Sequence, residues 1–201
     1  MAKHRNHNGL RNLLLILGVV ALWDRNRRWN ETFQAASLGA TQVNGPDGKP
    51  RNGRRVIVQS VLPASPSKVW DRARQPATLV EVTHPLLGFV SRDGRPLPEK
   101  WQKGDTIRLR LLGLGLIPLG NHDIIVMRVD NKKRELESAE SGQLATIWNH
   151  TIRVEPSGEG QTLYTDEVDL AAGPLNPIIG QFAYFFFRYR QTRWQRLVRQ
   201  L

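Results

Sequence analysis

Two predicted strands near the end of the chain carry the residues best suited to acid–base chemistry. The segment "TIWNHTIRVE" alternates in polarity, so Trp148, His150 and Ile152 share one face of a strand. A second strand, "TLYTDEVDL", follows after the Gly-rich loop 156–160 and predicts a hairpin in which His150 lies directly opposite Asp166. An imidazole beside a carboxylate can orient a ligand or move a proton, and it can equally be a buried pair that only stabilises the hairpin.

The same register predicts the neighbours of this pair on the inner face of the hairpin. The expected cross-strand partners are Trp148 with Val168, His150 with Asp166, and Ile152 with Tyr164. We treat His150 and Asp166 as catalytic candidates, and all six residues as ligand-binding candidates. A shift of the register by one residue would instead turn Asp166 toward solvent.

The C-terminal stretch "QFAYFFFRYRQTRWQRLVRQL" predicts the second wall of such a site. Its first half is aromatic, its second half is rich in arginine, and the helix is expected to begin near residue 175. An apolar stripe at helical spacing comprises Leu175, Ile178, Phe182, Phe186 and Tyr189. Phe182, Phe186 and Tyr189 are therefore ligand-binding candidates. Arg193 continues the stripe and is either a contact at the cavity rim or a solvated side chain paired with acids of the sheet.

The remaining elements must position these two walls. Residues 54–65 predict a strand, the segments "SPSKVWDRA" and "ATLVEVTH" predict two short helices, and six strand-like segments follow from residue 87 to residue 171. This order predicts an α+β fold, in which a curved antiparallel sheet of about seven strands wraps around the long C-terminal helix. One helix cannot fill the concave face of such a sheet, so we expect an internal apolar cavity.

The N-terminal quarter differs from the rest in composition. Residues 13–23 form an uninterrupted apolar run of eleven, too short for a simple transmembrane helix, which needs roughly 20 residues. Residues 1–29 are interpreted as a peripheral membrane anchor, a signal-like segment, or a helix that packs on the protein itself. Residues 30–53 predict a flexible linker, and residues 54–201 the folded ligand-binding domain.

The net charge of +11 lies mostly at the two ends of the chain. Residues 1–55 contribute +7 and residues 185–201 contribute +5, whereas the body, residues 56–184, carries −1. A nucleic-acid-binding domain would concentrate basic residues on its body, so we expect no nucleic-acid partner. The basic ends are either solvated or attracted to an anionic membrane, with residues 10–29 as the peripheral contact.

Several other kinds of site are not supported by the sequence. The chain has no cysteine, which excludes disulfides and thiolate chemistry. His84 precedes a proline at a helix end, His122 begins a strand, and no pair of histidines has metal-ligand spacing. No phosphate-binding or nucleophile-elbow motif occurs. We therefore expect neither a metal nor a cofactor.

Three stretches resemble a known superfamily. "VLPASPSKVWD", "WNHTIRVEPSGEGQTLYTDEVDLAAG" and "FFFRYRQTRWQRL" are similar to the bacterial polyketide cyclase and dehydrase-like branch of the START and pollen-allergen-like superfamily, SRPBCC. The resemblance covers about residues 54–201. It implies the helix-grip fold and a cavity that holds a ligand.

We favour the binding or transport of a hydrophobic, lipid- or polyketide-like molecule over catalysis. The alternative is a cyclase, aromatase or dehydratase that uses His150 and Asp166 for proton transfer. The expected partner is an apolar small molecule. A cytoplasmic or membrane-associated location and secretion through an N-terminal signal are all compatible with the sequence.

Overall fold

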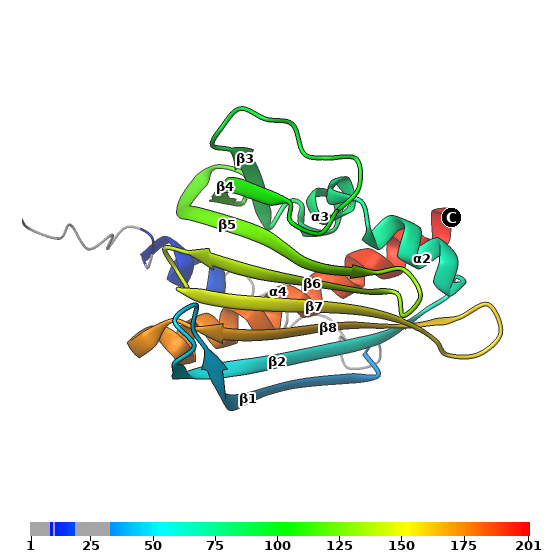
Figure 1. Ribbon diagram of the computed structural model, residues 1–201, viewed down its shortest axis with the longest axis horizontal. Helices are drawn as coiled ribbons and strands as arrows, with labels where there is room; N and C mark the ends of the chain where they lie inside the picture. The colour runs from blue at the N-terminus through cyan, green and yellow to red at the C-terminus, as the bar shows by residue number, and fades with distance from the viewer. Residues whose placement is uncertain (1–8, 10, 19–32) are drawn as a thin grey trace, which may run out of the picture.

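The protein is an eight-stranded antiparallel sheet with one long helix across its face (Figure 1). The computed structural model describes residues 9, 11–18 and 33–201. The sheet order is β1-β2-β8-β7-β6-β5-β4-β3. The strands are β1 (Ala35–Asn44), β2 (Pro50–Leu62), β3 (Leu87–Ser91), β4 (Thr106–Gly113), β5 (Ile117–Asp130), β6 (Glu135–Gly142), β7 (Ile147–Pro156) and β8 (Thr162–Ala171). The helices are α2 (Pro66–Ala73), α3 (Pro76–Thr83), η2 (Gly173–Leu175), α4 (Asn176–Leu197) and η3 (Val198–Gln200).

The long helix α4 forms the second layer of the fold. It contacts β2, β1 and β8 on the sheet and α3 on its other side. Figure 1 shows α2 and α3 near the C-terminal end of α4, where the chain finishes. The predicted α+β helix-grip architecture is confirmed, with two short helices between the early strands and the rest of the sheet.

Strand β1 corrects the prediction that residues 30–53 are a linker. Residues 35–44 form an edge strand, and β2 already begins at Pro50. The Gly- and Pro-rich stretch between them is a hairpin turn, in which Gly45 N–H donates to Lys49 O and Gly48 has a φ of +73°. The strand has few β-branched residues and is mostly exposed, so its sequence lacks a strand pattern. Its order comes from pairing with the free edge of β2.

Part of the N-terminal apolar run packs on the protein itself. Residues 11–18 are helical, and the side chains of Leu13 and Ile16 are buried in the main apolar cluster. Leu14 and Leu15 lie on the opposite side of this helix and are exposed. Of the helices that the structure describes, none is both long and apolar enough to cross a membrane. The remainder of the predicted anchor or signal-like segment, residues 1–8, 10 and 19–29, lies outside the described residues.

The close approach of β1, β2 and β8 at Gly53 predicts the effect of two alanine substitutions. A methyl group at Gly53 would collide with the backbone carbonyl of Leu170 and with Val43, whereas nothing surrounds the same position at Gly39. We expect Gly53→Ala to lower the free energy of unfolding by about 1–3 kcal/mol, because overpacked positions distort their neighbours. Gly39→Ala should leave it unchanged or raise it by less than about 1 kcal/mol. Denaturant unfolding of both variants measures the difference, and equal values would show that β1 is not packed as described.

Candidate functional site

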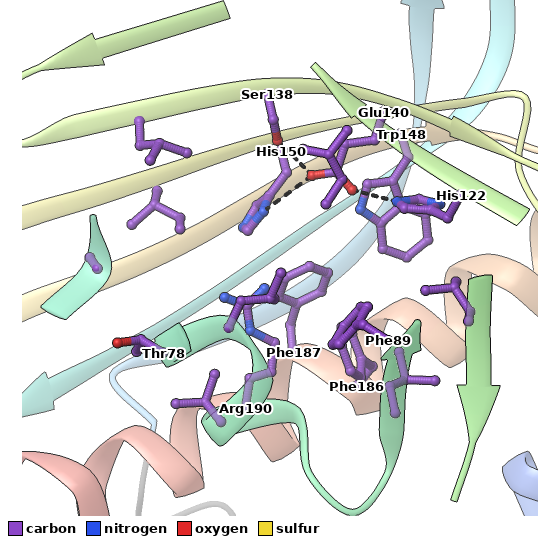
Figure 2. Close-up of a pocket in the computed structure, with 18 of the residues that line it drawn as sticks. Thr78, Phe89, His122, Ser138, Glu140, Trp148, His150, Phe186, Phe187 and Arg190 are labelled. Carbon is purple, nitrogen blue, oxygen red and sulfur yellow. Dashed lines mark hydrogen bonds and ion pairs between the residues drawn. The ribbon is translucent and has the colours of Figure 1, made fainter. Parts of the chain in front are cut away.

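A cavity of about 100 Å³ lies between the sheet and α4. At roughly 10–15 Å³ per water-sized group, it has room for several such groups. Its apolar wall comes from every layer of the fold and includes Leu87 and Phe89 of β3, Leu111 of β4, Ile124 and Val126 of β5, Trp148 and Ile152 of β7, and Ile179, Phe182, Phe186 and Phe187 of α4. The polar wall is smaller and comprises Thr78, His122, Ser138, Glu140, His150 and Arg190 (Figure 2).

His150 and Asp166 are hydrogen-bonded, although not in the predicted register. His150 pairs with Val168 and Ile152 with Asp166, so β8 is displaced by two residues from the expected alignment. The turn explains the shift, because Pro156 still pairs with Thr162 and the loop is therefore 157–161. A displacement of two keeps every side chain on its predicted face. His150 Nε2 and Asp166 Oδ1 consequently meet diagonally, at 2.9 Å.

Asp166 is fully buried and holds four partners together. Gln191 Nε2 donates to its Oδ2 at 3.2 Å, and Arg190 Nη2 lies 3.6 Å from its Oδ1. Tyr164 Oη donates to Oδ1 at 3.4 Å. Burial opposes ionisation of Asp166, but the Arg190 charge and the His150 hydrogen bond outweigh it and lower the pKa of the carboxyl group. Burial raises the pKa of the Tyr164 hydroxyl well above its ordinary value, so this hydroxyl remains a donor.

Glu140 places a second carboxylate on the other side of His150. Its Oε2 lies 2.7 Å from His122 Nε2, and its Oε1 accepts from Ser138 Oγ at 2.6 Å. Burial again opposes ionisation, but the hydrogen bond and charge of His122 lead the groups that lower the pKa of Glu140. Glu140 Oε1 is 4.0 Å from His150 Nδ1. Figure 2 shows His150, Glu140 and His122 in a row along the sheet.

The ring of Phe187 packs against both His150 and Arg190. Its ring centroid is 4.9 Å from that of His150 and 4.9 Å from Arg190 Cζ, which faces the ring. Arg190 Nε has no hydrogen-bond partner among the described residues, although the side chain is only 4% exposed. A buried donor of this kind can donate a hydrogen bond to a ligand oxygen, which would supply its missing partner.

The imidazole of His150 has one nitrogen engaged and the other on the side of Glu140. Because the carboxylate of Asp166 is ionised, His150 Nε2 carries the proton of their hydrogen bond. Nδ1 is then a lone-pair acceptor in the neutral ring and a donor in the protonated ring. A ligand oxygen can contact His150 Nδ1 and Glu140 Oε1 together, since 4.0 Å is spanned by two hydrogen bonds at a right angle.

The predicted site residues divide into two groups in the structure. Those that line the cavity are Trp148, His150, Ile152, Tyr164, Phe182 and Phe186. Those that do not line it are Asp166, Val168, Tyr189 and Arg193. Asp166 and Val168 are buried in the sheet behind the wall. Tyr189 is also buried and its hydroxyl donates to His84 O, while Arg193 is half-buried farther along α4.

The helix meets the cavity along a different line from the predicted stripe. Phe187, Arg190 and Trp194 face the cavity with Phe182 and Phe186, so the inward surface is rotated away from Tyr189 and Arg193. A stripe chosen for hydrophobicity alone excludes an arginine. The spacing of Arg190, three and four residues after two phenylalanines, is the signal that could have identified it.

Glu140 and His122 were also missed as members of the site. Glu140 lies in "RELESAES", which has the composition of an exposed strand, and His122 seemed to be only the start of a strand. The two strands pair in the sheet, with Glu140 opposite Ile124 and His122 opposite Gly142. The correct pairing register of β5 with β6 would have brought the two residues together. A bulge between Val126 and Arg128 interrupts the alternation of polar and apolar residues, so this register could not be inferred from the sequence.

Solved structures with the same fold come from several bacteria. A protein of Chromobacterium violaceum has a TM-score of 0.58 and 14% identity, covering 72% of this chain and 96% of its own. A START superfamily protein of Mycobacterium smegmatis has a TM-score of 0.54 and 17% identity, covering 73% and 97%. The ZhuI aromatase/cyclase of Streptomyces sp. R1128 has a TM-score of 0.58 and 12% identity, covering 73% and 94%. At sequence identities this low, the structural similarity shows a shared fold and nothing more.

At the level of sequence, no curated protein matches the chain significantly. A family model matches residues 60–200, from within β2 to the end of η3. This match includes the cavity walls of the sheet, α2, α3 and α4, and leaves out helix 11–18 and β1. The chain therefore belongs to the family described as Domain of unknown function (DUF8410).

Proposed function

We propose that the protein binds a small, largely apolar molecule with one neutral polar oxygen in the cavity between the sheet and α4. The observation that carries this proposal is the composition of the wall, which is aromatic and aliphatic except around His150, Glu140 and Arg190. Ligand sites commonly combine an apolar surface with a few converging polar groups. The apolar wall supplies affinity, and the polar groups orient the ligand.

The charges around His150 favour a neutral oxygen over a carboxylate. Asp166 and Glu140 are both held ionised, and Arg190 on α4 is the cation beside Asp166. A ligand carboxylate would bring a third negative charge to a buried place with one arginine. A hydroxyl group can donate to Glu140 or to His150 Nδ1 and accept from Arg190 without adding charge.

A second candidate is a cyclase, aromatase or dehydratase reaction. The arrangement that favours it is an imidazole with one nitrogen on a buried carboxylate and the other near the cavity, as general acid–base catalysis requires. In that case Asp166 positions His150, and the group that reaches the substrate is His150 with Glu140 nearby. The ZhuI structure is named for an aromatase/cyclase, which supports testing this class first. Turnover of a polyketide-like substrate that persists in His150→Gln would exclude this mechanism.

Filling the cavity should abolish ligand binding. Ile124 lines the cavity, and its neighbour Ile125 is exposed on the other face of β5. We expect Ile124→Trp to weaken the binding of the small fluorescent ligand 2-naphthol by tenfold or more, on the order of the loss of one buried side chain's contacts. Ile125→Trp adds the same group outside and should bind as the unchanged protein does. Leu111→Trp is a second cavity-filling variant, and probe binding that survives both would contradict the proposal.

The polar wall should discriminate between ligands of one shape. We expect 2-naphthol to bind about tenfold more tightly than 2-methylnaphthalene, because its hydroxyl gains a charge-assisted hydrogen bond. His150→Gln retains an amide that can donate to Asp166 but removes the Nδ1 position, so it should bring the two dissociation constants together. Titration calorimetry measures both. Discrimination that is unchanged in His150→Gln would place the recognition elsewhere.

Acid should remove the stabilisation that Asp166 provides. Its pKa is lowered in the folded protein, so its contribution is complete above the ordinary value of 3.8 and is lost as pH falls through the lowered value. Asp166→Asn should be about 3–5 kcal/mol less stable at neutral pH, with a smaller loss below pH 3.8. The exposed Asp71→Asn serves as the control and should resemble the unchanged protein. Unfolding curves recorded across this pH range test the expectation. Equal dependence of the free energy of unfolding on pH in the unchanged protein and in Asp166→Asn would refute it.

A further inference from the structure

Exposed apolar side chains gather at one end of the sheet. Nine large hydrophobic residues are exposed among the described residues, and four of them lie on helix 11–18 and on the β4–β5 turn. These four, the leucine patch, are Leu14 (48% exposed), Leu15 (61%), Leu114 (39%) and Leu116 (83%). Single exposed leucines are ordinary, but a group of them marks a surface that contacts something apolar.

Two contacts hold the helix against the turn. Asn12 Nδ2 donates to Pro118 O at 3.3 Å, and the Ile16 side chain fills the space above Gly113, which ends β4. Figure 1 shows helix 11–18 and the β4–β5 turn at the same end of the sheet. The four leucines therefore belong to one region of the surface.

The turn has a sequence that its own conformation does not favour. Leu114 has a φ of +52°, in the left-handed region that Gly or Asn occupies with less strain. Its side chain is also exposed, so it contributes little burial in return. A leucine that is both strained and exposed does not help the chain to fold. It therefore indicates that an apolar side chain at this turn has a function other than stability.

We infer that the leucine patch docks the protein on an anionic lipid bilayer. Arg11 on the helix and Arg110 on β4 are exposed next to the patch in sequence, and neither has an ion-pair partner among the described residues. The chain carries a net charge of +11, most of it outside the neutral body. Aliphatic side chains flanked by unpaired arginines suit the acyl boundary and the phosphates of a membrane surface better than they suit a second protein.

The inner side of the same helix belongs to the apolar cluster that adjoins the ligand cavity. Leu13 and Ile16 pack in one cluster with Leu87, Phe182 and Phe186, which line the cavity. Docking through Leu14 and Leu15 would thus bring this apolar cluster close to the bilayer. The docking surface itself does not depend on what the cavity holds.

Vesicle flotation of the full-length chain tests the inference. With vesicles of phosphatidylcholine and phosphatidylserine, we expect Leu114→Asn/Leu116→Asn to lower the partition coefficient by tenfold or more. Leu114→Asn alone should keep or raise the melting temperature, because Asn tolerates a positive φ. Arg11→Gln/Arg110→Gln should weaken binding on the order of tenfold, and only when phosphatidylserine is present.

The matched control is Met127→Asn, which removes an apolar side chain that is 51% exposed elsewhere on β5. It should bind vesicles as the unchanged protein does. Equal partition of all variants would overturn the inference. It would also be overturned if the unchanged protein were a dimer that Leu116→Asn dissociates, because the patch would then be a protein interface. Binding of 2-naphthol in solution should be the same in every docking variant, so failure here is distinguishable from failure of the proposed ligand site.

Discussion

The ionised carboxylate of Asp166 is the interaction on which the arrangement of sheet and helix depends. It is buried on β8, and its main partners come from elsewhere, with His150 on β7 and Arg190 and Gln191 on α4. A charge is tolerated in an apolar interior only where such partners surround it. Because Gln191 also donates to Val58 O on β2, one turn of α4 is fastened to two adjacent strands, β2 and β8, and Asp166 links it to His150 on the third.

This fastened turn shapes the cavity. It lies between two apolar clusters, one toward the N-terminal half of α4 and one around Trp194 and the short helices. The cavity lies beside this turn, and side chains of β5 and β6 form part of its wall on the sheet. The polar wall is therefore a consequence of the same network, since His150 and Arg190 satisfy Asp166 on one side and face the cavity on the other.

Those parts of the site that rest on local periodicity could be predicted. The inward face of β7 follows from the two-residue period of a strand, and the His150–Asp166 contact survives a register error of two for the same reason. The contact of Glu140 with His122 could not be predicted, because it depends on the pairing of β5 with β6 around a bulge. The role of Arg190 could not be predicted, because a buried arginine can be identified only from its acidic partner, and this partner lies on another element.

The sequence by itself determined the order of the elements from residue 54 onward, the helix-grip architecture and the inward residues of the last hairpin. These follow from short-range patterns of polarity and from turn residues, which act within a few positions along the chain. The tertiary structure alone decided that residues 35–44 form a strand, that α4 turns Arg190 rather than Arg193 toward the cavity, and that Asp166 lies behind the cavity wall. Each of these is set by contacts between distant segments, where edge pairing and the burial of charge outweigh local preference.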